Sequence, residues 1–361
     1  MKSTILLLSF FAGAALLLSS CESSSRVTTP GEPDLERARQ ASRPRAPRER
    51  MDPPPVKVVL STEPWSFGSA TGMVIRTPNY RIYTTETSQA LRERLPEFLE
   101  RALAHYRSGL GALPAPTIRL DTYLMDSRPQ WVALSKRLTG TNDGPHDMIG
   151  RGGYALRGIG VFYDIGLYDT LAIAAHEGWH QYTQRTFKDP LPVWLEEGLA
   201  SYMEGHKWEG DRAVFQPWAN IERFDRLREA HAKGALIPFP TLLESSPQEL
   251  AKRGDGSELT YYAQVWALIH FLHEGDDNRY RAGLRSLLSD AARGRARIAM
   301  ANRFGRAQTI RLLSERRGAE MIALYCDADP AALGVAYDRF VETLVRSGAR
   351  NRITAGQSPL H

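Results

Sequence analysis

Cysteine is scarce in this sequence, since the 361 residues contain only Cys21 and Cys326. Long apolar runs are also scarce, because after residues 5–18 none approaches the roughly 20 residues that a membrane-spanning helix needs. A strong excess of one charge is absent as well, with 46 basic residues against 41 acidic ones. This small imbalance argues against nucleic-acid binding. No internal repeat is visible, and the 42% apolar content is that of an ordinary globular protein.

The N-terminus has the pattern of an export signal. Lys2 precedes the apolar residues 5–18, which suit a secretory signal better than a membrane span. The run ends in Leu-Ser-Ser-Cys21, which resembles the bacterial lipobox, so we expect cleavage after residue 20, lipidation of Cys21 and attachment to a membrane. Glu22 is not the aspartate that retains lipoproteins at the inner membrane, which favours the outer membrane. Cys326 then has no partner for an intramolecular disulfide, and its apolar surroundings predict a buried, inert thiol.

The rest of the chain predicts an α+β protein with two subdomains. Residues 21–55 are rich in Pro, Arg and Ser and predict a disordered tether. Residues 56–190 mix strand and helix patterns, residues 191–350 are mostly helical, and residues 351–361 predict a flexible tail. The expected strands are 56–60, 72–76, 80–84, 117–125 and 154–163; the expected helices are 88–109, 129–138, 170–185, 192–204, 221–232 and 259–274, with a loop at 207–220.

A His-Glu-x-x-His motif lies in the expected helix 170–185, which Asp169 or Thr170 can cap. His176 and His180 are one turn apart and therefore share a face of the helix. Their ring nitrogens can converge on one ion, while Glu177 stands about 100° around the helix axis beside the open coordination position. Catalytic zinc needs such fixed ligands, an exchangeable water and a nearby carboxylate. Since the motif also occurs in helices that bind no metal, the residues around it must decide whether this is a metal site.

A second helix follows at once and supplies a third ligand. A short Asp-Pro turn separates the two helices, which should be antiparallel. Counting turns from the shared loop places Glu197 opposite His180. Gly198 has no side chain and would allow the close helix approach that a third ligand needs. Glu196 is an alternative ligand that periodicity does not exclude.

These two helices resemble the gluzincin metallopeptidases of the MA clan, in which an HExxH helix is followed by a helix reading W-L-x-E-G. The matching residues here are 176–180 and 194–198. The resemblance selects Glu197, the residue before glycine, as the third Zn²⁺ ligand beside His176 and His180, and it implies a zincin-like fold. It is closest to the small bacterial peptidase-MA-like family of unknown function. Only 16 residues separate His180 from Glu197, fewer than in the aminopeptidase branch.

A third segment extends the resemblance. Residues 260–272 are similar to the Y-x-K-G helix of aminopeptidases, whose tyrosine stabilises the oxyanion, and Tyr262 takes that position. Gln264 and Val265 stand where that helix has lysine and glycine, so Tyr261 remains an alternative.

The resemblance also implies a place for substrate. Residues 151–164 stand where zincins carry the edge strand that pairs with substrate, so Gly152, Gly153 and Tyr154 are expected to bind it, the glycines leaving room for a peptide. The G-x-M-E-N signature, which holds a free substrate N-terminus in aminopeptidases, is absent. This absence favours an endopeptidase.

The function implied by the resemblance is zinc-assisted hydrolysis of polypeptides. Glu177 takes a proton from the zinc-activated water and passes it to the leaving amine, and Tyr262 stabilises the carbonyl oxygen. The alternative is a surface lipoprotein that keeps the zincin fold as a binding or scaffolding module without catalysis.

Other metal patterns are incomplete. Thr186 stands where metzincins carry a third histidine, and Asp277 replaces the second histidine of a motif that begins at His273. Five further histidines have no ligand spacing and are expected at the surface or in loops: His105, His146, His206, His231 and His361.

Overall fold

The structure is a computed structural model that describes residues 58–142, 144 and 152–360. All of these residues lie in one compact unit. The expected signal at residues 1–20, the lipidation site Cys21 and the whole tether at 21–55 lie outside the described residues, as do His146 and His361. Within the described part, no helix is long and apolar enough to cross a membrane.

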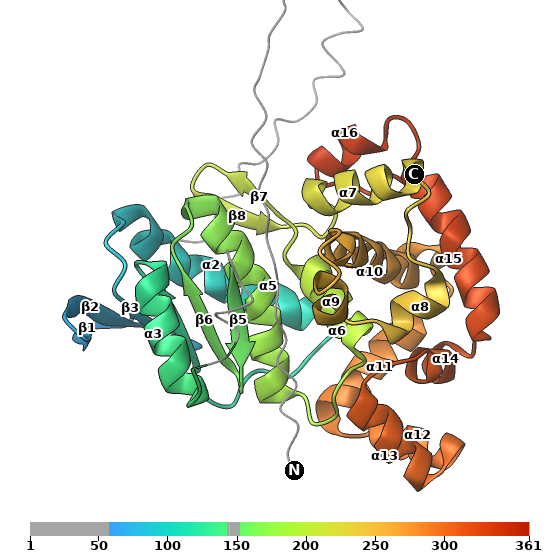
Figure 1. Ribbon diagram of the computed structural model, residues 1–361, viewed down its shortest axis with the longest axis horizontal. Coiled ribbons are helices and arrows are strands. Elements are labelled where there is room, and N and C mark those ends of the chain that lie inside the picture. The colour runs from blue at the N-terminus through green and yellow to red at the C-terminus, as the bar shows by residue number, and fades with distance from the viewer. Residues whose placement is uncertain (1–57, 143, 145–151, 361) are drawn as a thin grey trace, which may run out of the picture. The chain divides into compact units, whose positions relative to one another are not determined.

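A six-stranded mixed sheet forms the first part of this unit (Figure 1). Its strand order is β1-β2-β3-β4-β6-β5, in which β3, β4 and β6 are parallel and the other neighbours are antiparallel. Among the described strands, β5 is therefore an edge strand. The strands are β1 Ser61–Phe67, β2 Ala70–Arg76, β3 Tyr80–Thr84, β4 Leu120–Met125, β5 Gly153–Leu156 and β6 Ile159–Tyr163.

Helices cover both faces of the sheet because both faces carry apolar side chains. In β3, Tyr80, Ile82 and Thr84 are buried and alternate with half-buried residues, which is the period of a strand with one core face. That face packs in the main core with the helices α2 and α5, while α3 packs in a second apolar cluster on the opposite face. These helices are α2 Gln89–Ser108, α3 Arg128–Thr139 and α5 Leu167–Thr186.

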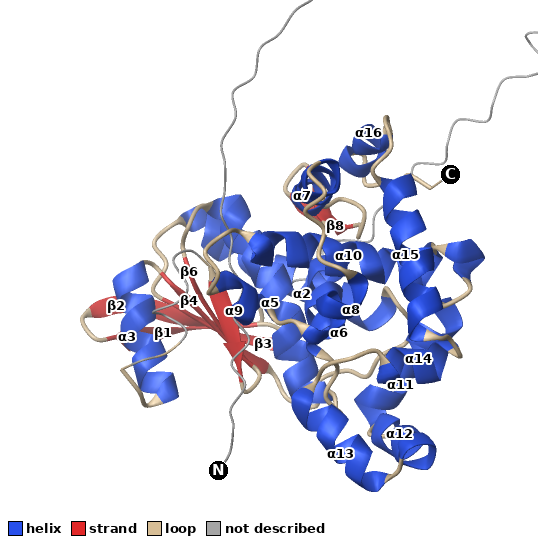
Figure 2. Ribbon diagram, turned by 45° about the vertical axis from the view of Figure 1, so that its right-hand side comes forward, coloured by secondary structure: helices blue, strands red, loops and turns tan. Residues whose placement is uncertain are grey.

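Beyond α5 the described chain is mostly helical (Figure 2). Its centre is α10, in which every residue from 260 to 272 is buried, as expected for a helix that is apolar on all sides. The helices α6 and α7 both contact α10. The elements are α6 Val193–Met203, α7 Ile221–Ala232, α8 Phe239–Glu244, α9 Pro247–Ala251, α10 Ser257–Glu274, η1 Asp276–Asn278, α11 Arg281–Arg293, α12 Ala296–Phe304, α13 Arg306–Glu315, α14 Glu320–Cys326, α15 Pro330–Leu344 and α16 Ala349–Thr354. The chain is thus an α+β protein, strand-rich first and helical afterwards.

Two of the β-hairpins differ from what the sequence predicts. Residues 154–163 have the pattern of one strand but form β5 and β6, joined by Arg157 and Gly158 with φ angles of 53° and 76°. Two successive positive φ angles are typical of a two-residue hairpin turn, which arginine rarely supplies. A second hairpin, β7 His206–Glu209 and β8 Arg212–Phe215, replaces part of the loop expected at 207–220.

Other elements differ from expectation at their ends. Residues 58–60, the described part of the strand expected at 56–60, form no strand, and β1, which begins at Ser61, is not predicted from the sequence. Residues 351–354, expected in the flexible tail, belong to α16. The helix expected at 221–232 has the bounds of α7, because Asn220 caps it by accepting from the Arg223 amide.

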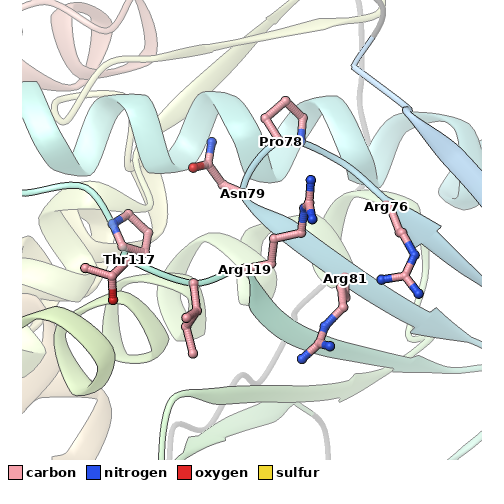
Figure 3. A pocket seen from close by; sticks show the side chains of 8 residues that line it. Arg76, Pro78, Asn79, Arg81, Thr117 and Arg119 are labelled. Carbon is pink, nitrogen blue, oxygen red and sulfur yellow. The ribbon is translucent and has the colours of Figure 1, made fainter.

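A cavity of about 510 Å³ lies where β2, β3 and the segment before β4 meet (Figure 3). Three arginines line it, and each is already engaged. Arg76 pairs with Glu63 at 3.0 Å, Arg81 pairs with Asp121 at 2.6 Å, and Arg119 Nε donates to a backbone carbonyl at 2.8 Å. The cavity shares no lining residue with α5 and is separate from the His-Glu-x-x-His motif.

Candidate metal centre

The helix α5 carries residues 176–180, whose two histidines and glutamate are at most 1% exposed. It begins earlier than expected. Gly166 is its N-cap residue, with φ 105°, so the predicted caps Asp169 and Thr170 lie inside its first turn. Thr170 instead accepts a hydrogen bond from the Ile165 amide at 3.0 Å, which holds the chain where it enters the helix.

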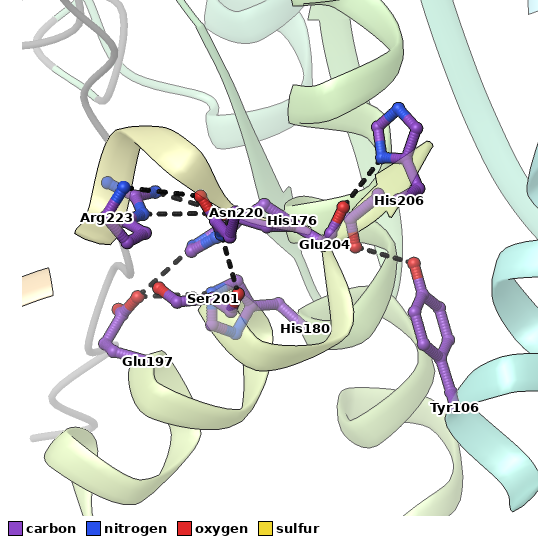
Figure 4. A network of polar contacts seen from close by, with 10 residues as sticks. Tyr106, His176, His180, Glu197, Ser201, Glu204, His206, Asn220 and Arg223 are labelled. Atoms are coloured by element: carbon purple, nitrogen blue, oxygen red, sulfur yellow. Dashed lines mark hydrogen bonds and ion pairs between the residues drawn. The ribbon is translucent and has the colours of Figure 1, made fainter. Parts of the chain in front are cut away.

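The helix α6 brings Glu197 against this motif (Figure 4). One carboxylate oxygen, Oε2, lies 3.4 Å from His176 Nε2 and 3.4 Å from His180 Nε2. Among the described residues this is the one group of three His, Cys, Asp or Glu side chains whose ligand atoms lie within 4.8 Å of one another. The third ligand expected from the sequence therefore meets the two histidines.

These donors fit a metal ion. Atoms about 2.0–2.1 Å from a tetrahedral zinc ion lie about 3.3 Å apart, close to the two observed separations. His176 Nε2, His180 Nε2 and both carboxylate oxygens of Glu197 are buried and have no hydrogen-bond partner among the described residues. Buried polar atoms are normally hydrogen-bonded, so this group of exceptions indicates a missing partner. Two imidazoles and a carboxylate are also a usual zinc ligand set.

The charges in the cluster suit a bound cation. Burial alone would raise the pKa of Glu197, but the two imidazoles outweigh burial and hold that pKa at about 2. Burial would lower the pKa values of the histidines, yet the neighbouring glutamates raise the pKa of His176 and bring that of His180 well above its ordinary value. A buried carboxylate is thus balanced either by protons on the rings or by a metal ion.

Glu196, the alternative ligand, points to the other side of His180. Its Oε1 accepts from His180 Nδ1 at 3.3 Å and from the Thr183 hydroxyl at 2.5 Å. A histidine that binds a metal through Nε2 commonly donates its Nδ1–H to such a carboxylate, which fixes the ring. The structure places Glu197 among the converging atoms and gives Glu196 this orienting contact.

Glu204 holds His176 in the same way, although no motif in the sequence predicts it. His176 Nδ1 donates to Glu204 Oε2 at 2.6 Å. The amide of Asn220 and the guanidinium of Arg223 donate to Glu204 Oε1 at 2.7 and 2.9 Å (Figure 4). Burial would raise the pKa of Glu204, but Arg223 and His176 together hold it at about 2. The available signal was spacing, because Glu204 follows Glu197 by two helical turns and shares its face.

The cluster lies in a segment that is similar to a known family. Residues 170–293 match the family described as "Protein of unknown function (DUF1570)". This match covers the three converging side chains together with Glu204 and Arg223. It runs from α5 to α11 and carries no named activity. No curated protein matches the chain.

Within the segment that matches DUF1570, two helical glycines permit close packing. A Cβ on Gly198 would lie 2.8 Å from the Val265 carbonyl oxygen, so this glycine brings α6 against α10. The expectation that Gly198 brings α6 against α5 is wrong. A Cβ on Gly178 would lie 2.7 Å from the Tyr106 hydroxyl, which donates to the Ala175 carbonyl at 2.6 Å and joins α2 to α5.

Of the two candidate tyrosines, Tyr262 lies beside the cluster. Its ring is 5.9 Å from the His176 ring in an edge-to-face arrangement. Tyr261 is also buried, but its hydroxyl donates to the Ser245 carbonyl at 3.3 Å. Burial, with the charge of Glu197 adding to it, raises the pKa of Tyr261 well above the ordinary value. The geometry therefore favours Tyr262 for a role at the cluster.

The edge strand β5 begins at the expected place, but its side-chain positions are already used in packing. A Cβ on Gly153 would lie 2.8 Å from Phe162 Cβ, so this glycine fits against β6. Gly152 is likewise buried. The Tyr154 hydroxyl donates to Ser135 at 2.9 Å under α3. The expectation that the glycines leave room for a peptide is not met at Gly153, and all four residues of β5 are buried.

The remaining described histidines lie outside the cluster. His105 and His206 are half-buried against Phe215 rather than at the surface, and burial lowers the pKa of His105 to about 4. His273 contributes to no second metal group among the described residues, in line with its incomplete motif. Its neighbour Glu274 instead accepts from His270 Nδ1 at 3.0 Å.

Proposed function

We propose that the protein is a zinc-dependent metallopeptidase in which His176, His180 and Glu197 bind the ion. One observation carries this proposal: a single oxygen of Glu197 is equally distant from two unpartnered imidazole nitrogens, in a buried cluster. Outer carboxylates on both rings add support, because they hold each imidazole with Nε2 free to bind a metal.

The layout of the elements supports a zincin-like fold within this proposal. An edge strand, a helix with HExxH and a second helix with the third ligand follow in that order, and α5 packs against both β5 and β6. Among the described strands, β5 pairs on one side only. An extended polypeptide can add to such an edge by backbone hydrogen bonds, and this would lay it along α5.

The side chains then have distinct roles in hydrolysis. A bound zinc ion would lower the pKa of a water molecule and polarise the scissile carbonyl. Glu177, next to His176 on α5 and buried, accepts the proton of the attacking water and returns it to the leaving amine. Tyr262 donates a hydrogen bond to the carbonyl oxygen as negative charge develops there.

The substitution Glu177→Gln tests the catalytic half of the proposal. It removes the base but keeps the size of the side chain, so cleavage of an unstructured polypeptide should fall at least about 100-fold while bound zinc is unchanged. Cleavage by the parent protein should also stop with a chelator and return with added zinc. Stoichiometric zinc without cleavage of any of several varied polypeptides would favour the non-catalytic scaffold instead.

A further inference from the structure

Arg223 is a buried cation that the hydrolytic proposal leaves without a role. It lies in the first turn of α7 and is 3% exposed. Its Nε donates to Glu204 Oε1 at 2.9 Å, and its Nη2 lies 3.4 Å from Glu204 Oε2. This two-point contact fixes the plane of the carboxylate, whose Oε2 also accepts from His176 Nδ1. The orientation of the His176 ring is thus tied to the position of Arg223.

The same guanidinium reaches Tyr262. The Cζ atom of Arg223 lies 5.0 Å from the centre of the Tyr262 ring, within the range of a cation–π contact. The Tyr262 ring in turn meets the edge of the His176 ring at 5.9 Å. A closed ring of contacts therefore joins four side chains: His176 of α5, Glu204 at the C-terminal end of α6, Arg223 of α7 and Tyr262 of α10.

We infer that Arg223 is a positioning residue for two groups of the site. It orients the metal ligand His176 through Glu204, and it places the hydroxyl of Tyr262 through its contact with the tyrosine ring. The second half rests on the proposed hydrolytic function, whereas the first concerns metal binding alone. Only arginine offers both contacts, because its planar fork matches a carboxylate while its face stacks on an aromatic ring. Lysine would keep the charge that balances Glu204 but lose the fork and the stacking.

The variant Arg223→Lys tests the first half. Zinc affinity should fall about 10-fold to 100-fold, the usual loss when an outer contact of a metal-binding histidine is disturbed. Affinity is measured on the full chain by competition with a chromogenic chelator, below the thermal transition of each metal-free variant. Arg226→Lys is the matched control, since Arg226 lies one turn further on α7 and contacts Thr260 and Gly256 rather than Glu204. Its zinc affinity should equal that of the parent protein.

A second variant keeps the test decisive if Arg223→Lys does not fold. Asn220→Ser keeps a side-chain oxygen that can cap α7 but loses the amide that donates to Glu204 at 2.7 Å. It should also weaken zinc binding. A purely structural role for the network predicts a lower thermal midpoint with unchanged zinc affinity of the folded protein, and that result would overturn the inference.

The second half is tested by turnover at saturating zinc. Arg223→Lys should lower kcat with little change in KM, and this loss should disappear when Tyr262 is already Phe, because the misplaced group is then absent. An equal loss of kcat in the Tyr262→Phe background would contradict the coupling. If the parent protein binds zinc but cleaves nothing, the hydrolytic proposal fails while the zinc-affinity result still decides the role of Arg223 toward His176.

Discussion

The two adjacent glutamates of α6 show how a difference of one residue separates the proposed metal ligand, Glu197, from Glu196, which contacts the opposite nitrogen of the His180 ring. Neighbouring positions on a helix differ by about 100°, so Glu196 and Glu197 cannot face the same atom of His180. Glu197 approaches Nε2, and Glu196 accepts from Nδ1. Periodicity could not choose between them because both glutamates are buried. Glu196 and Glu197 are distinguished only by their contacts with His180, which lies on a different helix.

The two adjacent tyrosines of α10 should separate in the same way. Tyr262→Phe should lower kcat about 100-fold to 1000-fold, the usual loss for an oxyanion donor, and leave bound zinc unchanged. Tyr261→Phe removes a hydrogen bond to the Ser245 carbonyl and should lower stability by about 1 kcal/mol with kcat unchanged. Steady-state kinetics at saturating zinc and urea unfolding measure the two effects. A large loss of kcat in Tyr261→Phe alone would reverse the assignment.

The contact between α6 and α10 sets where Glu197 stands. Gly198→Ala would place a Cβ 2.8 Å from the Val265 carbonyl oxygen and 2.9 Å from Ile269 Cγ1, so backbone must move. We expect a loss of about 1–3 kcal/mol in the free energy of unfolding, measured with urea, together with weaker zinc binding.

Ser201→Ala is the control on the same helix. The Ser201 hydroxyl is buried without a hydrogen-bond partner among the described residues, so its removal should cost little stability. Equal stability of Gly198→Ala and the parent protein would show that α6 and α10 do not need this close approach.

The elements that the sequence predicts well are those whose signals are local. Ser88 accepts from the Leu91 amide at the start of α2, and Asn220 caps α7, so both helices begin where their capping residues indicate. The start of α5 is not predicted because its N-cap residue, Gly166, has no side chain to mark that position. The hairpin at Arg157 and Gly158 was missed because a non-glycine residue adopts a positive φ angle there.

The architecture of the whole chain depends on contacts that no local pattern contains. The sequence predicts an α+β protein and brings His176, His180 and Glu197 together through two motifs close in the chain. It does not predict that Glu204 and Arg223 complete the surroundings of the cluster, because their roles depend on how α6, α7 and α10 pack. Charge alone gave no signal, since Arg223 looks like any arginine on an amphipathic helix.

The most direct test of the account is the zinc content of the purified protein and of two alanine variants, measured by atomic emission. The parent protein and Glu196→Ala should each hold one zinc ion per chain at saturating zinc, the latter with affinity about 10-fold to 100-fold lower, and Glu197→Ala should hold none. Circular dichroism of each variant confirms that it is folded. A full equivalent of zinc in folded Glu197→Ala, with loss of zinc from Glu196→Ala, would contradict the proposed metal centre.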